Sequence, residues 1–539
     1  MTSPQLRCCD SSGCRSAGSG ALRQALLEAR DAAGLSAADL PIKPVGCLRL
    51  CGRGPLVACD DTSGASSLYG GVPSSEAAEL IRATGAGLPA APSPIRAATA
   101  DQLAPHHLDP AHPFFHLQRP VVLETCGRID PSSIADALEH GAYGQLRRCL
   151  EQLSPEEVRD QVRRSGLRGR GGAGYPTGLK WDTVALQPPG PRYVVCNADE
   201  GDPGAFMDRS VLEGDPHRLL EGMAIAAFAV GAERGFVYVR AEYPLAIERL
   251  QLAIRQARQK HFLGHAICGS RFNLQIDIRV GAGAYVCGEE TALLQSIQGQ
   301  RGQPRPRPPY PAQSGLWGAP TLINNVETFT SIPVILREGG DWYAAMGTEG
   351  SKGTKVFALS GAIHNTGLVE VPMGIPLRTV VEEMGGGVTD GTSVKAVQTG
   401  GPSGGCIPAS ELDTPVDYES LKALGSMMGS GGMVVMSQTT SMPDVARHFM
   451  RFSVNESCGK CLPCRAGTVQ MLELLNGFAD HRAGPGDLER LEELCGMVRA
   501  TSLCGLGQAA PNPVLSTLRF FRAEYEAAGG VPSQGGSAS

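Results

Sequence analysis

The sequence predicts a multidomain α/β protein whose chain ends in a helical bundle. At 539 residues the chain is too long for one hydrophobic core, and three or four domains are expected. Between residues 118 and 340, short strand-like runs alternate with helical patterns, which is typical of an α/β layer. From residue 443 onward the apolar spacing is helical and surrounds a group of closely spaced cysteines. These observations place a sheet-based core in the middle of the chain and a bundle at its end.

The composition argues against several classes of protein. The formal charge of −6 is unlike that of a nucleic-acid-binding protein, which would show a basic patch. No apolar run is long enough to span a membrane, and the N-terminus lacks the apolar core of a signal peptide. Seventeen cysteines in a long chain without such a signal indicate a reducing compartment, where clustered cysteines more often bind metal than form disulfides. We therefore expect a cytoplasmic protein with no direct membrane span and no nucleic-acid partner.

Five segments are expected along the chain. They are a small cysteine-bearing unit at 1–85, an Ala- and Pro-rich linker at 86–117, an α/β domain at 118–340, a strand-rich domain with Gly-heavy turns at 341–440, and a helical domain at 441–530. The strands and helices expected in the α/β domain include Tyr193–Cys196, Pro216–Val230, Gly235–Arg240, Pro244–Gln259 and Leu274–Val280. The helices expected in the last domain are Pro443–Phe452, Thr468–Phe478, Gly486–Ala500 and Pro513–Ala527. The tail Gly529–Ser539 is predicted to be disordered.

The cysteines of the last domain predict an iron–sulfur cluster. Cys458, Cys461 and Cys464 have C-x2-C-x2-C spacing, and Cys504 lies farther along the chain. Three thiolates on one short loop and one remote thiolate suit a 4Fe–4S cube. The position where a bacterial ferredoxin carries its next cysteine is Thr468 here, so Cys504 is the best candidate for the fourth ligand. A zinc site is the alternative, although zinc sites usually use paired C-x2-C knuckles rather than a triple.

A glycine-rich loop predicts a phosphate-binding site. Gly169, Gly171 and Gly174 match G-x-G-x-x-G, with Gly172 among them, and Arg168, Arg170 and Lys180 add positive charge. Such glycines let backbone N–H groups approach phosphate oxygens closely. An ordinary Rossmann turn follows a strand, whereas Pro155–Ser165 before this loop has a helical pattern. A flexible surface loop is the alternative interpretation.

Polar segments after predicted strands suggest the rest of a cofactor pocket. Asn197, Asp199, Glu200 and Asp202 follow one strand, and Tyr285, Gly288, Glu289 and Glu290 follow another. Ligands of α/β proteins bind at the carboxyl ends of strands, and carboxylates there can bind sugar or ribityl hydroxyls or a flavin N–H. The adjacent amides Asn324 and Asn325 could bind a flavin or sugar, or could simply stabilise a turn.

The N-terminal unit carries a second set of paired cysteines. Cys9 and Cys14 have four residues between them, and Cys47 and Cys51 have three. Two pairs of thiolates suit a 2Fe–2S cluster, with a zinc ribbon as the alternative. Cys8 is adjacent to Cys9 and competes with it as a ligand. The cysteines outside both sets are expected to be small apolar core residues, with Cys59 left unassigned.

Taken together, these motifs resemble the flavoprotein subunit of the NADH-oxidising module shared by respiratory complex I, NAD-linked hydrogenases and NAD-linked formate dehydrogenases. The resemblance covers nearly the whole chain and rests on five segments: Gly-Leu-Arg-Gly-Arg-Gly-Gly-Ala-Gly, Cys-Asn-Ala-Asp-Glu, Cys-Gly-Glu-Glu-Thr-Ala-Leu, Glu-Ser-Cys-Gly-Lys-Cys and Ser-Leu-Cys-Gly. The start of the chain looks most like the diaphorase subunit of bidirectional nickel–iron hydrogenases. The resemblance implies a thioredoxin-like 2Fe–2S domain, a Rossmann-like FMN and NAD domain, a ubiquitin-like domain and a helical 4Fe–4S domain.

The resemblance also implies roles for individual residues. The loop Gly169–Gly174 and Lys180 would hold phosphates, Asn197, Asp199 and Glu200 would line the flavin and nicotinamide pocket, and Glu289, Glu290, Asn324 and Asn325 would bind FMN or NAD(H). Tyr175 and Tyr310 would stack near the adenine. Asp202 stands where complex I commonly has Glu, which makes exclusion of NADP less secure than binding of NAD. Glu200 is the candidate catalytic residue, as an electrostatic tuner of the site.

The function implied is that of a diaphorase. Hydride would pass between NAD(H) and FMN, and single electrons would pass through the iron–sulfur clusters to or from a hydrogenase module. Other iron–sulfur subunits and a nickel–iron hydrogenase module are the expected partners, with ferredoxin as a further one. A formate dehydrogenase or complex I is the alternative setting. A scaffold in which the clusters only hold the fold together is the alternative class, against which the glycine loop and the carboxylates argue.

Overall fold

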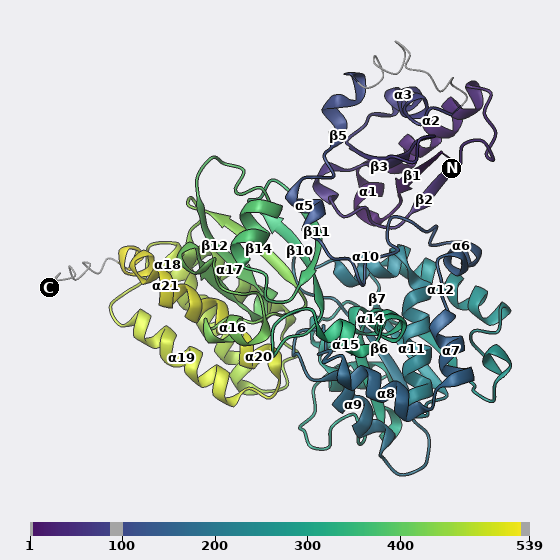
Figure 1. The fold of residues 1–539 in the computed structure, drawn as a ribbon. Coiled ribbons are helices and arrows are strands. Elements are labelled where there is room, and N and C mark those ends of the chain that lie inside the picture. The colour runs from purple at the N-terminus through teal and green to yellow at the C-terminus, as the bar shows by residue number, and fades with distance from the viewer. Residues whose placement is uncertain (1–3, 87–100, 530–539) are drawn as a thin grey trace.

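The computed structural model describes residues 4–86 and 101–529. The N-terminal unit sits on the α/β unit and the strand-rich unit, and the C-terminal helices lie at the far side of the strand-rich unit (Figure 1). Residues 87–100 of the predicted linker and residues 530–539 of the predicted tail lie outside the described part. Among the described residues no helix is both long and apolar enough to cross a membrane.

The N-terminal unit is a five-stranded sheet with helices. The strand order is β2-β1-β3-β4-β5, in which β1 and β2 are parallel and the other neighbours antiparallel. The elements are β1 (Gln5–Cys9), α1 (Ser12–Ser16), α2 (Ser19–Ala32), β2 (Ile42–Val45), β3 (Leu56–Asp60), β4 (Ser66–Gly70), α3 (Ala77–Ala83) and β5 (His107–Leu108).

Part of the predicted linker is folded. The strand β5 pairs with β4 and completes the N-terminal sheet. The short helix α5 (Pro113–His116) then inserts Phe114, which is fully buried, into the core of the strand-rich unit. The sequence did not predict these contacts, because a two-residue strand and a single buried aromatic residue produce no periodic pattern of apolar residues.

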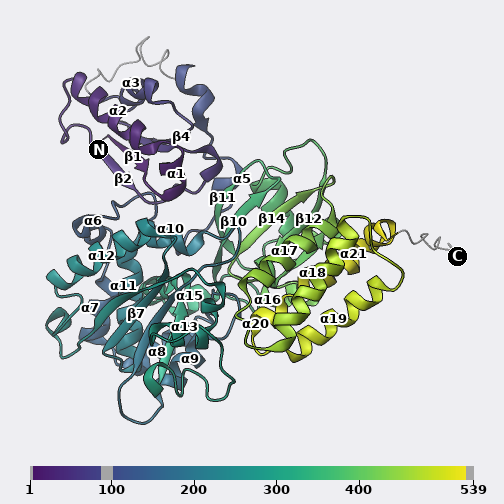
Figure 2. The same ribbon diagram turned by 180° about the vertical axis from the view of Figure 1, so that it is seen from behind.

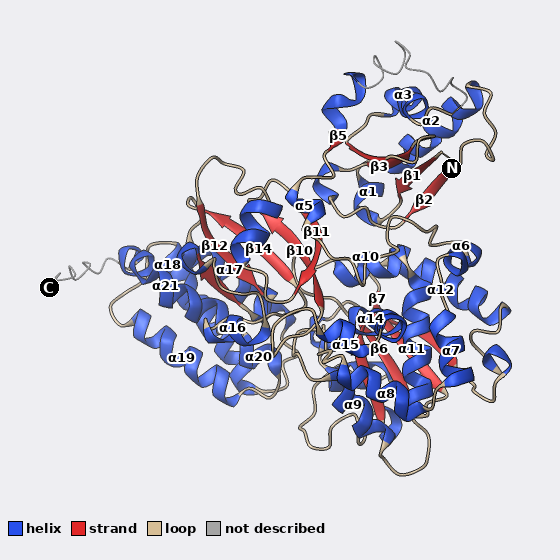
Figure 3. Ribbon diagram, viewed as in Figure 1, coloured by secondary structure: helices blue, strands red, loops and turns tan. Residues whose placement is uncertain are grey.

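The α/β unit is built on four parallel strands in the order β8-β7-β6-β9. Figure 3 shows helices on both faces of these strands. The predicted helices Pro216–Val230 and Pro244–Gln259 are confirmed with the same bounds, and the predicted strands are confirmed to within two residues. The elements are α6 (Ile134–Glu139), α7 (Gly144–Gln152), α8 (Pro155–Arg164), α9 (Thr177–Ala185), β6 (Tyr193–Ala198), α10 (Met207–Gly214), α11 (Pro216–Val230), β7 (Arg234–Arg240), α12 (Pro244–Gln259), β8 (Gln275–Gly281), α13 (Glu290–Ile297), β9 (Thr321–Asn325), α14 (Val326–Glu338) and α15 (Gly340–Ala344).

The strand-rich unit is a second mixed sheet, with the order β11-β10-β14-β12-β13. Its strands β10 and β14 are parallel, and the other neighbouring pairs are antiparallel. The elements are β10 (Thr354–Gly361), β11 (Gly367–Pro372), β12 (Val394–Thr399), β13 (Gly405–Pro408), α16 (Tyr418–Ala423) and β14 (Gly432–Ser437).

The C-terminal unit is helical, as predicted, and packs on the second sheet. The reverse view shows α17 and α21 beside the strand-rich unit (Figure 2). Several contacts join the two units, among them the hydrogen bond from the backbone N–H of Cys406 in β13 to Ser516 Oγ at 2.9 Å. The elements are α17 (Met442–Glu456), α18 (Thr468–Ala479), α19 (Asp487–Thr501), α20 (Gly505–Ala509) and α21 (Asn512–Ala528).

A fully buried ion pair joins the α/β unit to the strand-rich unit. The ammonium of Lys355, in β10, donates to the carboxylate of Glu327, in α14, and both side chains are almost inaccessible to solvent. The second oxygen of Glu327 accepts the backbone N–H of Val356 at 2.9 Å. Both charges are therefore satisfied only while the two units stay packed.

We predict that Lys355→Met destabilises the protein by about 3–5 kcal/mol, because it leaves the Glu327 carboxylate buried without its cation. The measurement is the denaturant midpoint of unfolding, followed by far-UV circular dichroism. The double variant Lys355→Met, Glu327→Gln is the control and should recover most of the loss. Equal stability of the single variant and the wild type would contradict the importance of this pair.

Candidate flavin and iron–sulfur sites

The carboxyl ends of β6, β8 and β9 meet at one edge of the parallel sheet. Asn197, at the end of β6, donates from Nδ2 to the carbonyl of Gly288 at 2.9 Å, in the segment that follows β8. The same side chain accepts the backbone N–H of Asp199 at 3.1 Å. Two of the polar segments singled out in the sequence are therefore joined. The strand order changes direction at β6, between β7 and β9, which is where α/β sheets bind ligands.

The glycine loop lies against the same edge. It connects α8 to α9 and is closed by a hydrogen bond from the N–H of Gly169 to the carbonyl of Tyr175 at 2.8 Å. A Cβ atom on Gly171 would lie 3.2 Å from the side chain of Asn325, at the end of β9. Lys180 donates to the carbonyl of Ile323 at 3.2 Å, and its ammonium lies 3.7 Å from Glu290. The loop, the lysine and the strand ends thus form one site.

Two glycines of the loop are required by its backbone. Gly172 and Gly174 have φ values of +122° and +63°, which side chains rarely adopt. A Cβ atom on Gly174 would also lie 2.7 Å from the ring of Tyr418, whose hydroxyl donates to the carbonyl of Gly169 at 2.9 Å. The loop is therefore held in one shape by the strand-rich unit. This observation argues against the flexible-loop interpretation.

Arg170 differs from the expectation that it would contact a cofactor. Its guanidinium is fully buried and donates to the carbonyls of Thr354, Arg168 and Lys352 and to the hydroxyl of Tyr343. Its backbone N–H donates to Thr328 Oγ1 at 2.9 Å. Arg170 anchors the loop to the strand-rich unit instead of presenting charge to a ligand. The sequence shows the charge but not the direction in which the side chain points.

Two of the predicted carboxylates cap helices. Glu200 is buried and accepts the backbone N–H groups of Asp208 and Arg209 at 3.0 and 3.1 Å, at the start of α10. Glu289 accepts the N–H groups of Thr291 and Ala292, both at 2.9 Å, at the start of α13. A carboxylate at a helix N-terminus is stabilised by the unpaired N–H groups and the helix dipole. Glu200 therefore fixes the loop after β6, and its carboxylate faces helix α10.

Asp199 has the opposite character, because neither of its carboxylate oxygens has a hydrogen-bond partner among the described residues. Its side chain is almost fully buried, and the nearest cation is Arg240, with its nitrogen 3.7 Å away. Burial raises the pKa of Asp199 to about 7, although Arg240 opposes the rise. A buried acceptor without a partner costs free energy, so this site fits a bound molecule that supplies polar N–H or O–H groups. A flavin or a sugar carries such polar groups.

The adjacent amides at the end of β9 are also engaged. Asn324 accepts the indole N–H of Trp181 at 3.1 Å, and Asn325 caps α14 by accepting the N–H of Thr328 at 3.0 Å. The Nδ2 atom of Asn325 lies 3.3 Å from the buried carboxylate of Asp208. Burial and the neighbouring Glu200 raise the pKa of Asp208 well above its usual range. Asp208 was missed in the sequence, where it stands in an ordinary helix pattern.

Asp202 does not face open space. Its two carboxylate oxygens accept the hydroxyls of Tyr285, at 2.8 Å, and Ser430. The expectation that its shorter side chain alters the rejection of a 2′-phosphate has no support in this arrangement. Ser430 comes from the loop before β14, far away in sequence, so the sequence pattern could not reveal the contact.

The two predicted stacking residues lie at the mouth of the site. Tyr175 and Tyr310 are each about half exposed, at 51% and 52%. Lys180 lies over the first ring and Arg307 over the second, each 5.8 Å from the centroid. Both cations pair with Glu290, at 3.7 and 2.9 Å. This chain of contacts links the two tyrosines across the entrance.

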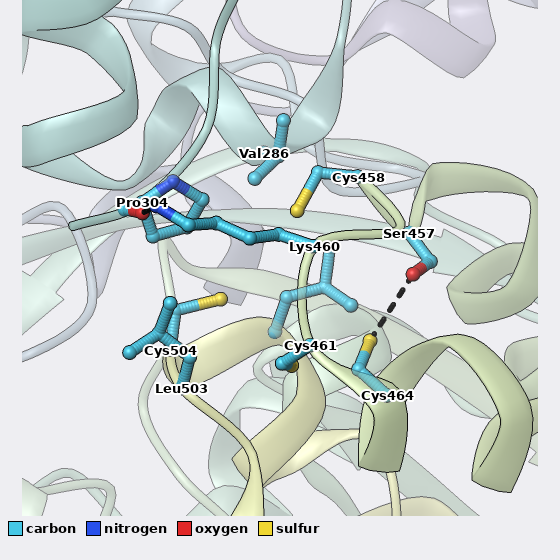
Figure 4. Close-up of a pocket in the computed structure, with 10 residues that line it drawn as sticks. Val286, Pro304, Ser457, Cys458, Lys460, Cys461, Cys464, Leu503 and Cys504 are labelled. Atoms are coloured by element: carbon cyan, nitrogen blue, oxygen red, sulfur yellow. Dashed lines mark hydrogen bonds between the residues drawn. The ribbon is translucent and has the colours of Figure 1, made fainter. Parts of the chain in front are cut away.

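The four C-terminal cysteines line one small cavity. Figure 4 shows Cys458, Cys461, Cys464 and Cys504 around it, with Lys460 and Val286 at its wall. Cys504 stands directly before α20, and burial raises the pKa of its thiol to about 11, although the backbone N–H groups of Leu506 and Gly507 oppose the rise. Val286 and Pro304 belong to the α/β unit, so the cavity lies where the helical and α/β units meet.

The choice between a cluster and a zinc ion rests on the spacing of the cysteines. Zinc sites usually use paired C-x2-C knuckles, whereas Cys458, Cys461 and Cys464 form a triple with a remote fourth cysteine. Four cysteines around one cavity fit a 4Fe–4S cube.

The structure separates Cys8 from Cys9. Neighbouring residues of β1 point to opposite faces, and Cys8 packs in the small N-terminal core, where burial raises its pKa to about 12. Cys9 lies on the other face, where hydrogen bonds with Cys14 and Cys47 lower its pKa well below the usual range. The Sγ atoms of Cys47 and Cys51 are 3.9 Å apart. The structure thus brings together Cys9, Cys14, Cys47 and Cys51, and leaves Cys8 out.

Comparisons with known proteins agree with these two sites. Residues 162–334 match the family described as the Nuo51 FMN-binding domain, and residues 444–528 match the NADH-ubiquinone oxidoreductase-F iron-sulfur binding region. The chain is 54% identical over 407 residues to the NADP-reducing hydrogenase subunit HndC of Solidesulfovibrio fructosivorans, covering 76% of this chain and 83% of that protein.

The chain belongs to the Nuo51 family. It is an FMN- and 4Fe–4S-binding oxidoreductase subunit, and NAD(H) is the substrate of the family. The F 2 subunit of the NADH-quinone oxidoreductase of Rhizobium meliloti (strain 1021) is 46% identical over 408 residues, covering 76% of this chain and 97% of that protein. The crystal structure of an NAD+-reducing [NiFe]-hydrogenase in the H2-reduced state matches with a TM-score of 0.68 and 31% identity, covering 99% of this chain and 85% of that one. Membership of this oxidoreductase family excludes the alternative of a non-enzymatic scaffold in which the clusters only hold the fold together.

We predict that Asp199→Asn stabilises the flavin-free protein in a pH-dependent way. The folded pKa is raised from 3.8 to about 7, so the wild type alone loses stability as the pH rises from about 4 to 7, at roughly 1.4 kcal/mol per unit. The advantage of the variant should grow over that window, reach at most about 4 kcal/mol and then stay constant. Unfolding midpoints at pH 5, 6, 7 and 8 measure it. A constant difference at all four pH values would contradict the assignment.

Proposed function

We propose that this chain is the electron-input subunit of a hydrogenase complex, in which it exchanges electrons between NAD(H) and iron–sulfur carriers. One observation carries the proposal: a single segment, residues 285–288, borders both sites. Gly288 accepts the hydrogen bond from Asn197 in the flavin site, and Val286 lines the cysteine cavity. In addition, the N–H of Tyr285 donates to Glu456, two residues before Cys458, at 3.0 Å. The two sites are thus neighbours at one junction of the fold.

FMN, when bound, exchanges two electrons at a time with NAD(H) and single electrons with iron–sulfur clusters. In the proposed arrangement the glycine loop and Lys180 bind phosphate, Asp199 accepts from polar groups of the flavin, and Asn197 holds the strand ends together. Tyr175 and Tyr310 frame the entrance for the dinucleotide. Glu200 positions the loop after β6 by capping α10, and it influences the site through its charge. If Glu200→Gln left the reduction potential of FMN unchanged, the charge of Glu200 would have no influence on the flavin.

We assign the units as a thioredoxin-like domain at 1–85, an FMN- and NAD-binding Rossmann-like domain at 118–340, a ubiquitin-like domain at 341–440 and a helical 4Fe–4S domain at 441–530. The mixed sheet with β1 parallel to β2 supports the first assignment, and the four parallel strands support the second. Residues 107–117 pack against their neighbours rather than only linking them. All seventeen cysteines are free, which supports a reducing compartment such as the cytoplasm.

The proposed partners are the other iron–sulfur subunits of a diaphorase module and a nickel–iron hydrogenase, with ferredoxin as an additional carrier. The hydrogenase relative and the hydrogenase structure support this setting. A formate dehydrogenase or complex I is the second candidate setting, and the NADH-quinone oxidoreductase relatives favour complex I. Anaerobic affinity purification from the native cell, with mass spectrometry and metal analysis, tests the choice. Stoichiometric nickel with hydrogenase subunits would support the first setting, whereas molybdenum or membrane subunits would contradict it.

We predict that Cys47→Ser removes the EPR signal of an N-terminal 2Fe–2S cluster but leaves NADH oxidation by an artificial acceptor at the wild-type rate. The reason is that Cys47 belongs to the N-terminal cysteine set and not to the flavin site. Cys8→Ser is the matched control and should keep the signal, because its side chain faces the opposite side of β1. Loss of both signal and activity in Cys47→Ser would mean that the N-terminal unit is structural.

A further inference from the structure

A serine hydroxyl contacts one of the four cysteines of the C-terminal cavity. Ser457 Oγ lies 3.3 Å from Cys464 Sγ, and the dashed line in Figure 4 marks this contact. Ser457 directly follows the last residue of α17, and Cys464 lies in the turn before α18. The two residues are seven positions apart, so the contact closes the loop that carries Cys458 and Cys461.

The direction of this hydrogen bond follows from the chemistry of the site. A cysteine that binds iron is a thiolate and has no proton to donate, so the hydroxyl of Ser457 must be the donor. The oxygen of Ser457 is itself within reach of the backbone N–H of Gly459, at 3.3 Å. Because that N–H points at the oxygen, the hydroxyl proton is directed away from it, toward the sulfur.

The surroundings strengthen the interaction. Cys464 is 5% exposed, and Val286, Pro304 and Leu506 give the cavity an apolar lining. In such low-dielectric surroundings a hydrogen bond to a charged atom is stronger than in water. Reduction of the cluster adds one electron and therefore one negative charge, which is spread over the iron, the inorganic sulfide and, in part, the cysteine sulfurs. A donor to one of these sulfurs stabilises the reduced state more than the oxidised state.

We infer that Ser457 sets the reduction potential of the 4Fe–4S cluster, by donating its hydroxyl proton to the thiolate of Cys464. The inference rests on the assignment of Cys458, Cys461, Cys464 and Cys504 as the ligands of that cluster. The electron comes from the flavin, which NADH reduces in the established chemistry of the family, and no bond is made or broken at Ser457. The serine thereby makes the cluster a better acceptor for electrons that arrive from the flavin.

The test is an EPR-monitored redox titration of the complete, flavin-containing protein. Ser457→Ala should lower the midpoint potential of the 4Fe–4S cluster, with an unchanged iron content. The expected change is at most roughly tenfold in the equilibrium constant for reduction, which for a one-electron couple is about 59 mV. Ser457→Thr keeps the hydroxyl and should titrate close to the wild type.

Ser453→Ala is the matched control. Ser453 lies one turn earlier, inside α17, is buried whereas Ser457 is half-buried, and donates to the carbonyl of Phe449 at 3.1 Å. Its substitution also removes a serine hydroxyl, but one that bonds a backbone carbonyl and not a cysteine, so the potential should not move. Equal potentials for Ser457→Ala and Ser453→Ala would overturn the inference.

A second measurement covers the case in which Ser457→Ala assembles too little cluster. Pulsed EPR of the reduced, unaltered protein in D2O should show an exchangeable deuteron coupled to the cluster, since a hydroxyl that bonds Cys464 exchanges with solvent. The absence of any such coupling would overturn the inference. A wild-type protein without the 4Fe–4S signal would contradict the cluster assignment itself, whereas a normal signal with an unmoved potential contradicts only the role of Ser457.

Discussion

The flavin site depends on one constraint, the convergence of parallel strands at a single sheet edge. Parallel strands all end on the same side, so the residues after β6, β8 and β9 are brought together although these strands end at Ala198, Gly281 and Asn325, far apart in sequence. The hydrogen bond from Asn197 to Gly288 joins the end of β6 to the segment after β8. The glycine loop gains its position from the same edge, because Lys180 binds the carbonyl of Ile323 in β9. A slip of any of these strands would separate the groups of the site.

Much of the polar chemistry near this edge holds the fold in place. Glu200, Glu289 and Asn325 each accept backbone N–H groups at the start of a helix. A helix that begins directly after a strand leaves several N–H groups without partners, and these side chains satisfy them. Asp199 is the exception, since it is buried without a hydrogen-bond donor among the described residues. The contrast separates the residues that build the pocket from Asp199, whose carboxylate has no hydrogen-bond partner among the described residues.

The cysteine sites share a different feature, which is their location between units of the fold. The C-terminal cavity is walled by Val286 and Pro304 from the α/β unit, and the N-terminal unit is tied to the same unit where Asp10 accepts from Arg249 at 2.7 Å. Clusters at such junctions are shielded from water and lie near more than one neighbour. Small side chains at these junctions, such as Ser457, can therefore adjust the electron affinity of a cluster without binding iron.

The sequence by itself determined the order of strands and helices in the α/β and helical units, both cysteine sets and the glycine loop that is predicted to bind phosphate. These features depend on local spacing, such as C-x2-C-x2-C, on apolar periodicity and on glycines that only certain backbones require. The tertiary structure decided which way each polar side chain points. It buried Arg170 among carbonyls, turned Cys8 away from Cys9, and paired Asp202 with Tyr285 and Ser430. Those outcomes depend on partners that lie far away in sequence. A local sequence pattern cannot show which way a side chain points when its partner comes close only in the folded protein.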